Sequence, residues 1–479
     1  MLLRHTLLYL PAQFVGPLFQ LIAMIVWTHV VDEHTLGIIT LVTATHELVQ
    51  IGFLAWWSQY ALRFFGRYQD SNDASRFYRT ENAVLLTSVT LQSLTVIGIL
   101  LLIIAPDAKP GILIATAGYV ITRSLNVYIA ERARVRHQIW AYSLQQVIGP
   151  AVGFLVGLVL IKLLGQSAEW PLAGYAIAQL AAALIVLPKI GYGRSFWPVD
   201  REIVAHALRY GIPLIIGGAL GWVGLNASRF IVNEMSGVAA AGLFAVGYGL
   251  GQRAAGVVSM LVTAAAFPLA VKTMEQGGAT AAMRQLADNS ALLVAILAPS
   301  LAGIFMLRAE IVHLLIAPAF QQATLTILPL ATLAGAIRNF RAHFGDQVFL
   351  LHSRTRWMMA VAAIDAATTV ILSAICIRYW GLAGGAGATV LAALAAATVS
   401  FTIGFSRFGL TLPMGHLIRI ALATVAMAAL LRSFPEATKF IILAGHIAAG
   451  AGVYIATLAL LYAPTLLKML RPRPQHSGA

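Results

Sequence analysis

Long apolar segments recur along the whole chain, and they constrain its fold more than any other feature. Each segment is about 20 residues long, enough for a helix to cross the hydrocarbon core of a bilayer. Within lipid, such segments satisfy their backbone hydrogen bonds by forming helices. Of the 479 residues, 59% are hydrophobic and only 10% are charged, too few to cover a soluble globule. The sequence therefore predicts an all-α polytopic membrane protein.

We expect about fourteen transmembrane helices with short connections. The longest polar interruption, Lys189–His206, is shorter than the smallest stable domain, so a soluble catalytic domain is excluded. The single cysteine, Cys376, cannot form an internal disulfide. The predicted spans are Leu7–Val30, Leu36–Phe64, Ala83–Ala105, Ile112–Ala130, Trp140–Leu163, Leu172–Leu187, Leu208–Ile231, Ala239–Phe267, Ala291–Met306, Ala323–Leu351, Trp357–Ile377, Leu382–Phe405, Ile418–Leu431 and Phe440–Tyr462.

The distribution of lysine and arginine predicts the orientation. With the N-terminus in the cytoplasm, nineteen of the 32 basic residues fall on the cytoplasmic side and six on the outside. This asymmetry follows the positive-inside rule and supports fourteen crossings with both termini cytoplasmic. The net charge of +14 therefore needs no nucleic acid partner. The basic tail Lys468–Arg473 is expected to contact anionic membrane lipids.

A repeat with an offset of about 200 residues divides the chain. Tyr9–Pro11 and Thr35–Ile38 open the first two spans, and Tyr210–Pro213 and Ala241–Phe244 reproduce that layout. Six spans separate the copies, so both halves have the same orientation and a pseudo-two-fold axis lies along the membrane normal. We predict an N-terminal six-helix bundle (1–188), a cytoplasmic linker (189–207), a C-terminal six-helix bundle (208–406), and two extra helices with the basic tail (407–479).

Several motifs occur in a characteristic order and spacing along the chain. They are Tyr210–Pro213, Asn226–Ile231, Gly237, Ala241–Phe244, Arg132–Arg136 in the loop after the fourth span, and Ile327–Leu330 in the tenth. This pattern resembles that of Wzx-type polysaccharide (O-antigen/exopolysaccharide) flippases of the multidrug/oligosaccharidyl-lipid/polysaccharide exporter superfamily. The resemblance covers nearly the whole chain. One departure is Ser228, where many relatives carry an acidic residue before the arginine.

This resemblance implies a flippase rather than an enzyme. Its cargo would be a polyprenyl-pyrophosphate-linked oligosaccharide for polysaccharide or lipopolysaccharide biosynthesis, moved from the cytoplasmic to the periplasmic leaflet of the bacterial inner membrane by alternating access. The implied partners are this lipid-linked oligosaccharide, membrane lipids, a coupling cation (H⁺ or Na⁺), and polysaccharide polymerase and chain-length proteins. No cofactor or metal is expected, since no metal-ligand or nucleotide-binding motif occurs in the sequence.

Four arginines near the middle of predicted helices are candidates for binding the anionic head group. An arginine at mid-bilayer costs about 2.5–3.5 kcal/mol on insertion scales, so it should face a bundle interior. A guanidinium group also suits phosphate oxygens. The alternative is that each arginine pairs with an internal carboxylate and holds helices together. For Arg63 and Arg229, which lie near predicted helix ends, we favour a position at the interface. The four candidates are Arg123, Arg253, Arg338 and Arg341.

Few carboxylates lie within the predicted spans. Ten residues after the equivalent glycines Gly37 and Gly242 come Glu47 and Gln252, the latter next to Arg253, so that symmetric positions carry opposite charge. We hypothesise that Glu47, with His46, is either a counter-ion that holds the cavity closed or a proton or sodium site. A plain salt bridge is the alternative. The remaining candidates for ion coupling or gating are Asp346 and Asp365.

Two other functions fit parts of the sequence. A cation-coupled multidrug exporter of the same superfamily would favour an acidic cavity, whereas this chain has more arginines than carboxylates within its spans. A membrane glycosyltransferase would need external acidic residues, and Asp32–Glu33 are such residues. Their loop is too short to assemble donor and acceptor sites.

Overall fold

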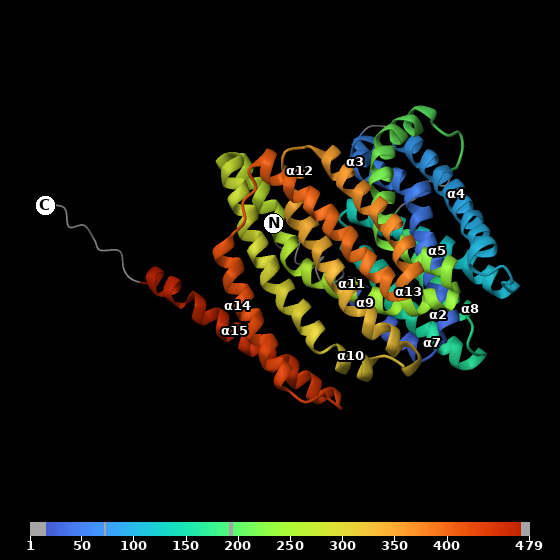
Figure 1. The fold of residues 1–479 in the computed structure, drawn as a ribbon. Coiled ribbons are helices and arrows are strands. Elements are labelled where there is room, and N and C mark those ends of the chain that lie inside the picture. Colours follow the sequence, from blue (N-terminus) through green and yellow to red (C-terminus); the bar gives the residue numbers. More distant parts are fainter. Residues whose placement is uncertain (1–15, 71–72, 191–194, 471–479) are drawn as a thin grey trace.

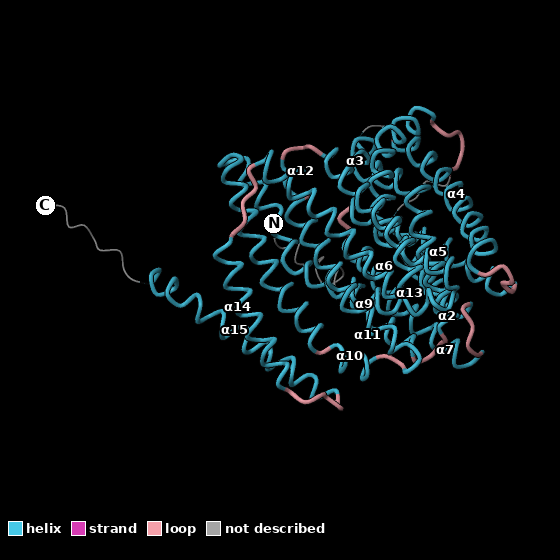
Figure 2. The backbone as a smooth tube through the Cα atoms, in the orientation of Figure 1, coloured by secondary structure: helices cyan, strands magenta, loops and turns pink. Residues whose placement is uncertain are grey.

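The computed structural model describes residues 16–70, 73–190 and 195–470, and these residues form an all-helical molecule (Figure 1). Short loops join the helices (Figure 2), and the described residues include no β-strand. The helices are α2 (Glu33–Gln50), η1 (Ile51–Ala55), α3 (Trp56–Asp70), α4 (Ala74–Ile99), η2 (Leu100–Ile104), α5 (Pro110–Val135), α6 (Ile139–Val147), η3 (Ile148–Val152), α7 (Gly153–Leu164), α8 (Glu169–Ile190), α9 (Arg201–Met306), α10 (Arg308–Leu315), α11 (Pro318–Phe340), η4 (Arg341–Gly345), α12 (Gln347–Leu351), α13 (Thr355–Phe408), α14 (Met414–Ser433) and α15 (Phe440–Leu470).

The number of membrane-length segments agrees with the sequence. Within the described residues, eleven helices are long and apolar enough to cross a membrane, and a shorter apolar helix spans Gly16–Thr28. Two of the eleven, Arg201–Met260 and Thr355–Phe408, are 60 and 54 residues long, far more than one crossing requires. When each of these two counts as two crossings, the eleven helices give thirteen segments, and the shorter helix brings the described segments to fourteen. The predicted all-α polytopic fold is confirmed.

Glycine divides the two longest helices into arms. The backbone has φ of +84° at Gly237, +75° at Gly278 and +55° at Gly381, a region that favours glycine because it has no Cβ. The chain therefore turns at these positions without a loop. Helix α9 consists of a first arm (201–236), a second (238–277) and a third (279–306), and α13 consists of arms 355–380 and 382–408.

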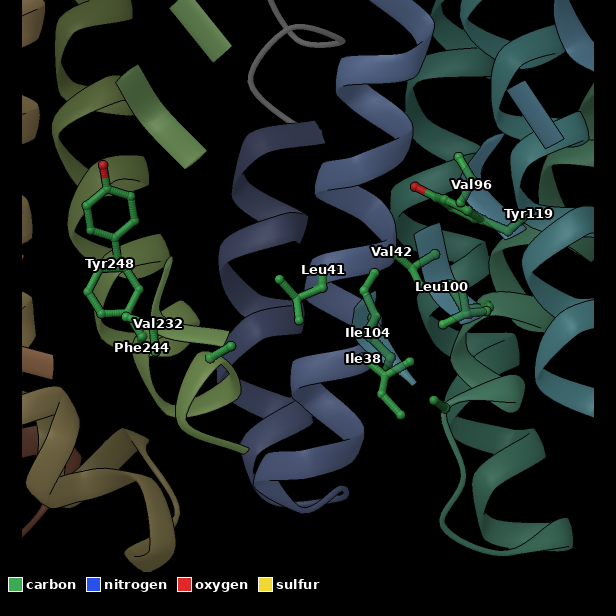
Figure 3. Close-up of a cluster of buried hydrophobic side chains, with 14 of the residues drawn as sticks. Ile38, Leu41, Val42, Val96, Leu100, Ile104, Tyr119, Val232, Phe244 and Tyr248 are labelled. Carbon is green, nitrogen blue, oxygen red and sulfur yellow. The ribbon is translucent and has the colours of Figure 1, made fainter. Parts of the chain in front are cut away.

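The helices pack in two sets. One includes α4, α5, α6, α7 and α8, and the other includes α9, α11 and α13. Helix α2 joins the sets through α9, and Figure 3 shows Leu41 and Val42 between Tyr119 on one side and Phe244 and Tyr248 on the other. Helices α14 and α15 pack on each other at one edge (Figure 1), with α14 against α9. The domain limits stay a prediction, and the motif Tyr9–Pro11 lies outside the described residues.

The two equivalent glycines of the sequence repeat meet at the junction between α2 and α9. A Cβ atom on Gly37 would overlap the carbonyl oxygen of Val238, and one on Gly242 would overlap that of Glu33. Gly37 therefore contacts Val238, four residues before Gly242, and Gly242 contacts Glu33, four residues before Gly37. This reciprocal contact allows the two backbones to approach more closely than any side chain would permit.

Substituting Gly37 with alanine is expected to destabilise the junction. The new methyl group would overlap a backbone carbonyl, and overpacking of this kind costs about 1–3 kcal/mol. The midpoint of thermal unfolding in detergent would measure the effect. Gly98→Ala is the matched control, because nothing lies within 4 Å of its Cβ position in α4. An unchanged midpoint for Gly37→Ala would contradict the close approach.

Asp200 connects the start of α9 to α4. Its carboxylate caps α9 by accepting hydrogen bonds from the backbone N–H groups of Glu202 (3.0 Å) and Ile203 (3.2 Å). It also pairs with Arg76, whose Nε lies 2.9 Å from Oδ2. Burial alone would raise the pKa of this carboxyl, but the hydrogen bonds from Ile203 and Arg76 outweigh it and hold the pKa below its usual 3.8.

The depressed pKa of Asp200 predicts a pH dependence of stability. A carboxyl whose pKa is lower in the folded state stabilises the fold at pH values above its unfolded-state pKa, which is near 3.8. This contribution is lost as the pH falls through the folded-state pKa. Wild type should therefore unfold at a higher temperature than Asp200→Asn at pH 6, and the difference should shrink below pH 3.8. A difference that does not depend on pH would contradict this assignment.

Candidate functional site

A central cavity of about 170 Å³ lies where the two sets of helices meet. The helix Gly16–Thr28, α2, α5, η3, α8 and the second arm of α9 form its wall. Four of the eight candidate residues line it, namely His46 and Glu47 from α2, Arg123 from α5 and Arg253 from α9. The structure therefore places Arg123, from the first half of the chain, and Arg253, from the second, around one space.

The two arginines of the central cavity lack carboxylate partners. Nη1 of Arg253 is buried and has no hydrogen-bond partner. Arg123 makes no ion pair or hydrogen bond with the described residues. Glu47 is exposed on the same wall and interacts electrostatically with Arg253 and Arg229 at longer range, without an ion pair among the described residues. Positive charge on the wall is therefore available to an anionic ligand.

His46 connects the cavity wall to a buried polar cluster. Its side chain is 1% exposed, and Nε2 lies 3.0 Å from the hydroxyl of Ser124. That hydroxyl donates to the amide oxygen of Gln92 at 2.9 Å. The ring of His46 also packs edge-on against Tyr119. These contacts attach α2 to α4 and α5, so His46 has a structural role next to Glu47.

Arg338 and Arg341 lie away from the central cavity and pair with carboxylates. Nη2 of Arg338 lies 2.8 Å from Oδ1 of Asp365, and Nη1 of Arg341 lies 2.9 Å from Oδ2 of the same side chain. Asp346 lies 3.3 Å from Arg341 and accepts a hydrogen bond from Ser400. Two arginines and two aspartates thus form a neutral network among α11, η4 and α13. The contacts of Arg338 and Arg341 therefore agree with the alternative that these arginines pair with internal carboxylates and hold helices together.

This ion-pair network lines a second cavity of about 230 Å³. Arg338, Arg341 and Asp365 form part of the wall, together with Gln252 and Asn339. Gln252 precedes Arg253, which lines the central cavity. The two cavities therefore lie on neighbouring faces of the second arm of α9.

Two charged residues near these sites differ from the sequence interpretation. Arg229 donates to the backbone oxygen of Thr40 at 3.4 Å and interacts with Glu47, so it lies at the junction of the two sets of helices. We expected it near a helix end, but the first arm of α9 continues to residue 236. The signal in the sequence that could have indicated this interior position was the motif Asn226–Ile231, which contains Arg229 and contributes to the family resemblance.

The predicted loop Arg132–Arg136 is largely helical, because α5 continues to Val135. The Arg132 side chain is buried and forms an ion pair with Glu81, to which Tyr128 also donates a hydrogen bond. Glu81 was not among the predicted buried carboxylates, since its span was expected to begin later. Within the described residues, no group of three His, Cys, Asp or Glu side chains could hold a metal ion.

Comparisons with known proteins place the chain in a family. Residues 2–274 match the family model described as "Polysaccharide biosynthesis protein". No curated protein matches the chain by sequence.

Several solved membrane transporters have the same fold. The lipid II flippase MurJ in an inward closed conformation is similar, with a TM-score of 0.74 and 14% identity over 96% of this chain and 100% of that one. An inward-facing multidrug resistance MATE family transporter has a TM-score of 0.59 and 17% identity, over 82% of this chain and 95% of that one. A transporter of the MOP superfamily from Pyrococcus furiosus has a TM-score of 0.56 and 15% identity, over 85% of this chain and 95% of that one. The chain therefore belongs to the polysaccharide biosynthesis protein family of the multidrug/oligosaccharidyl-lipid/polysaccharide exporter superfamily.

Proposed function

We propose that this protein flips a polyprenyl-pyrophosphate-linked oligosaccharide from the cytoplasmic to the periplasmic leaflet of a bacterial inner membrane, with both of its termini in the cytoplasm. The observation that carries the proposal is the pair Arg123 and Arg253, which line one cavity at the junction of the two halves without a carboxylate partner. A pyrophosphate group is anionic and strongly hydrated, and guanidinium groups replace its lost water with charge-assisted hydrogen bonds.

Movement of the two halves follows from the size of the cavity. About 170 Å³ accommodates a phosphate group but is smaller than the roughly 300 Å³ of a pocket for a drug-sized ligand. An oligosaccharide therefore enters only after the halves separate around Arg123 and Arg253. Rocking of the halves would expose the head group to each side in turn, while the polyprenyl tail stays in lipid.

Glu47 is the candidate for coupling. Its carboxylate lines the same cavity as Arg253 and interacts with that arginine electrostatically at longer range, so a pyrophosphate bound to Arg253 would offset this attraction. The nearby negative charge would then favour binding of a proton or sodium ion by Glu47. Asp365 and Asp346 are already paired with arginine and are weaker candidates. Vesicle transport that keeps its dependence on an ion gradient after Glu47→Gln and Asp365→Asn are combined would exclude both acids from coupling.

Deleting the gene in its native host tests the proposal. We expect a polyprenyl-linked oligosaccharide to accumulate in the cytoplasmic leaflet and the surface polysaccharide to disappear. A cation-coupled drug exporter is the second candidate, because the exposed carboxylate of Glu47 could attract an organic cation. Unchanged glycolipids together with new sensitivity to cationic drugs would favour the exporter. Co-purification with polysaccharide polymerase and chain-length proteins would test the proposed protein partners.

A further inference from the structure

The second cavity differs in charge from the central one. Its wall contains Arg338 and Arg341, but Asp365 and Asp346 neutralise them. Arg338 also has further partners, since its Nη1 donates to Tyr248 and its Nη2 to Thr369 as well as to the carboxylate. An additional anion would gain little here, because the cationic groups already have partners.

Hydrogen-bonding groups nevertheless remain available on this wall. The amide nitrogens of Gln252 and Asn339 donate to the backbone oxygens of Ala331 (3.3 Å) and Gly335 (2.8 Å). Their amide oxygens accept no hydrogen bond from the described residues and can serve as acceptors. Nη2 of Arg341 donates to no described residue and can serve as a donor. Leu220 and Leu225 add apolar surface on the opposite arm of α9.

A neutral wall that offers both acceptors and donors beside apolar carbon matches a sugar ring. Each sugar hydroxyl both donates and accepts, and the C–H groups of the ring need an apolar surface. The volume of about 230 Å³ is below the roughly 300 Å³ of a pocket for a drug-sized ligand, which suits one sugar rather than a chain. Consecutive Cα atoms are about 3.8 Å apart, so Gln252 brings this cavity next to the arginine at position 253.

From the function proposed above, we infer that the second cavity is a sugar subsite, in which Gln252 and Asn339 bind the sugar attached to the pyrophosphate held by Arg123 and Arg253. The two cavities then divide the recognition of the cargo. The central cavity binds the charge common to all such lipids, and the second distinguishes a glycosylated lipid from a bare one.

Binding to the purified full-length protein in nanodiscs tests this assignment. The probes are farnesyl pyrophosphate and its derivatives with one glucose, galactose or N-acetylglucosamine on the terminal phosphate. Wild type should bind at least one glycosylated probe about five- to tenfold more tightly than farnesyl pyrophosphate, the effect of about one net hydrogen bond. Asn339→Leu and Gln252→Leu should remove this preference and leave the affinity for farnesyl pyrophosphate unchanged.

Controls separate this inference from the function on which it rests. Gln322→Leu, an exposed change on the same helix as Asn339, should keep the preference. Asn339→Ala replaces Asn339→Leu if the larger side chain lowers the unfolding midpoint. A wild type that does not prefer any glycosylated probe, or variants that keep the preference, would overturn the sugar subsite. Farnesyl pyrophosphate binding that is absent, or insensitive to Arg253→Gln, would instead overturn the proposed function.

Discussion

Replacing Arg253 with glutamine is expected to weaken the binding of farnesyl pyrophosphate by about ten- to a hundredfold and to abolish flipping. Its guanidinium lines the central cavity with one buried N–H group unpaired, so it can bond directly to phosphate. A hydrogen bond to a charged group contributes about 1.5–3 kcal/mol, and each 1.4 kcal/mol is a factor of ten in affinity. Titration in nanodiscs and a flipping assay in vesicles would measure both effects.

The matched control is Arg284→Gln, which removes an exposed arginine from the third arm of α9. It should leave binding and flipping unchanged. Arg123→Gln should act in the same direction as Arg253→Gln, and the double variant should be weaker than either. Full flipping by Arg253→Gln, with normal expression and unfolding midpoint, would contradict the placement of the pyrophosphate in this cavity.

Much of this fold could be predicted from the sequence because lipid leaves the backbone few choices. An apolar segment long enough to cross the bilayer must be a helix, so the number of crossings follows from hydropathy. The ends of the helices are harder to predict. The chain turns at Gly237 and Gly381 without polar loops, and α5 continues through the basic run to Val135. Arg229 was misplaced for this reason.

The partners of the charged residues could not be predicted from the sequence. A charge within a predicted span indicates an interior position, but the sequence does not say which partner lies opposite. Asp365 follows Arg338 by 27 residues and belongs to another helix, so their contact depends on how α11 and α13 pack. The internal repeat was more informative, because the equivalent glycines Gly37 and Gly242 meet at the junction of the halves. It also relates Glu47 to the position beside Arg253, and both residues line the central cavity.

Asp365→Asn is expected to destabilise the protein strongly. Arg338, which is 6% exposed, would lose its carboxylate partner, whereas Arg341 would keep Asp346. Removing one member of a buried ion pair costs about 3–5 kcal/mol, because the remaining charge stays buried without compensation. Unfolding in detergent, followed by intrinsic fluorescence against temperature or denaturant, would measure the loss.

Adding Arg338→Gln to Asp365→Asn should restore part of this stability. The double variant has no uncompensated arginine at position 338 and keeps the Arg341–Asp346 pair, so the network remains neutral. Asp346→Asn is the matched single control and should cost less than Asp365→Asn, since Arg341 would still pair with Asp365 and no other arginine would lose its partner. If Asp365 were instead an ion-coupling site with little structural role, Asp365→Asn would unfold like wild type and Arg338→Gln would not rescue it.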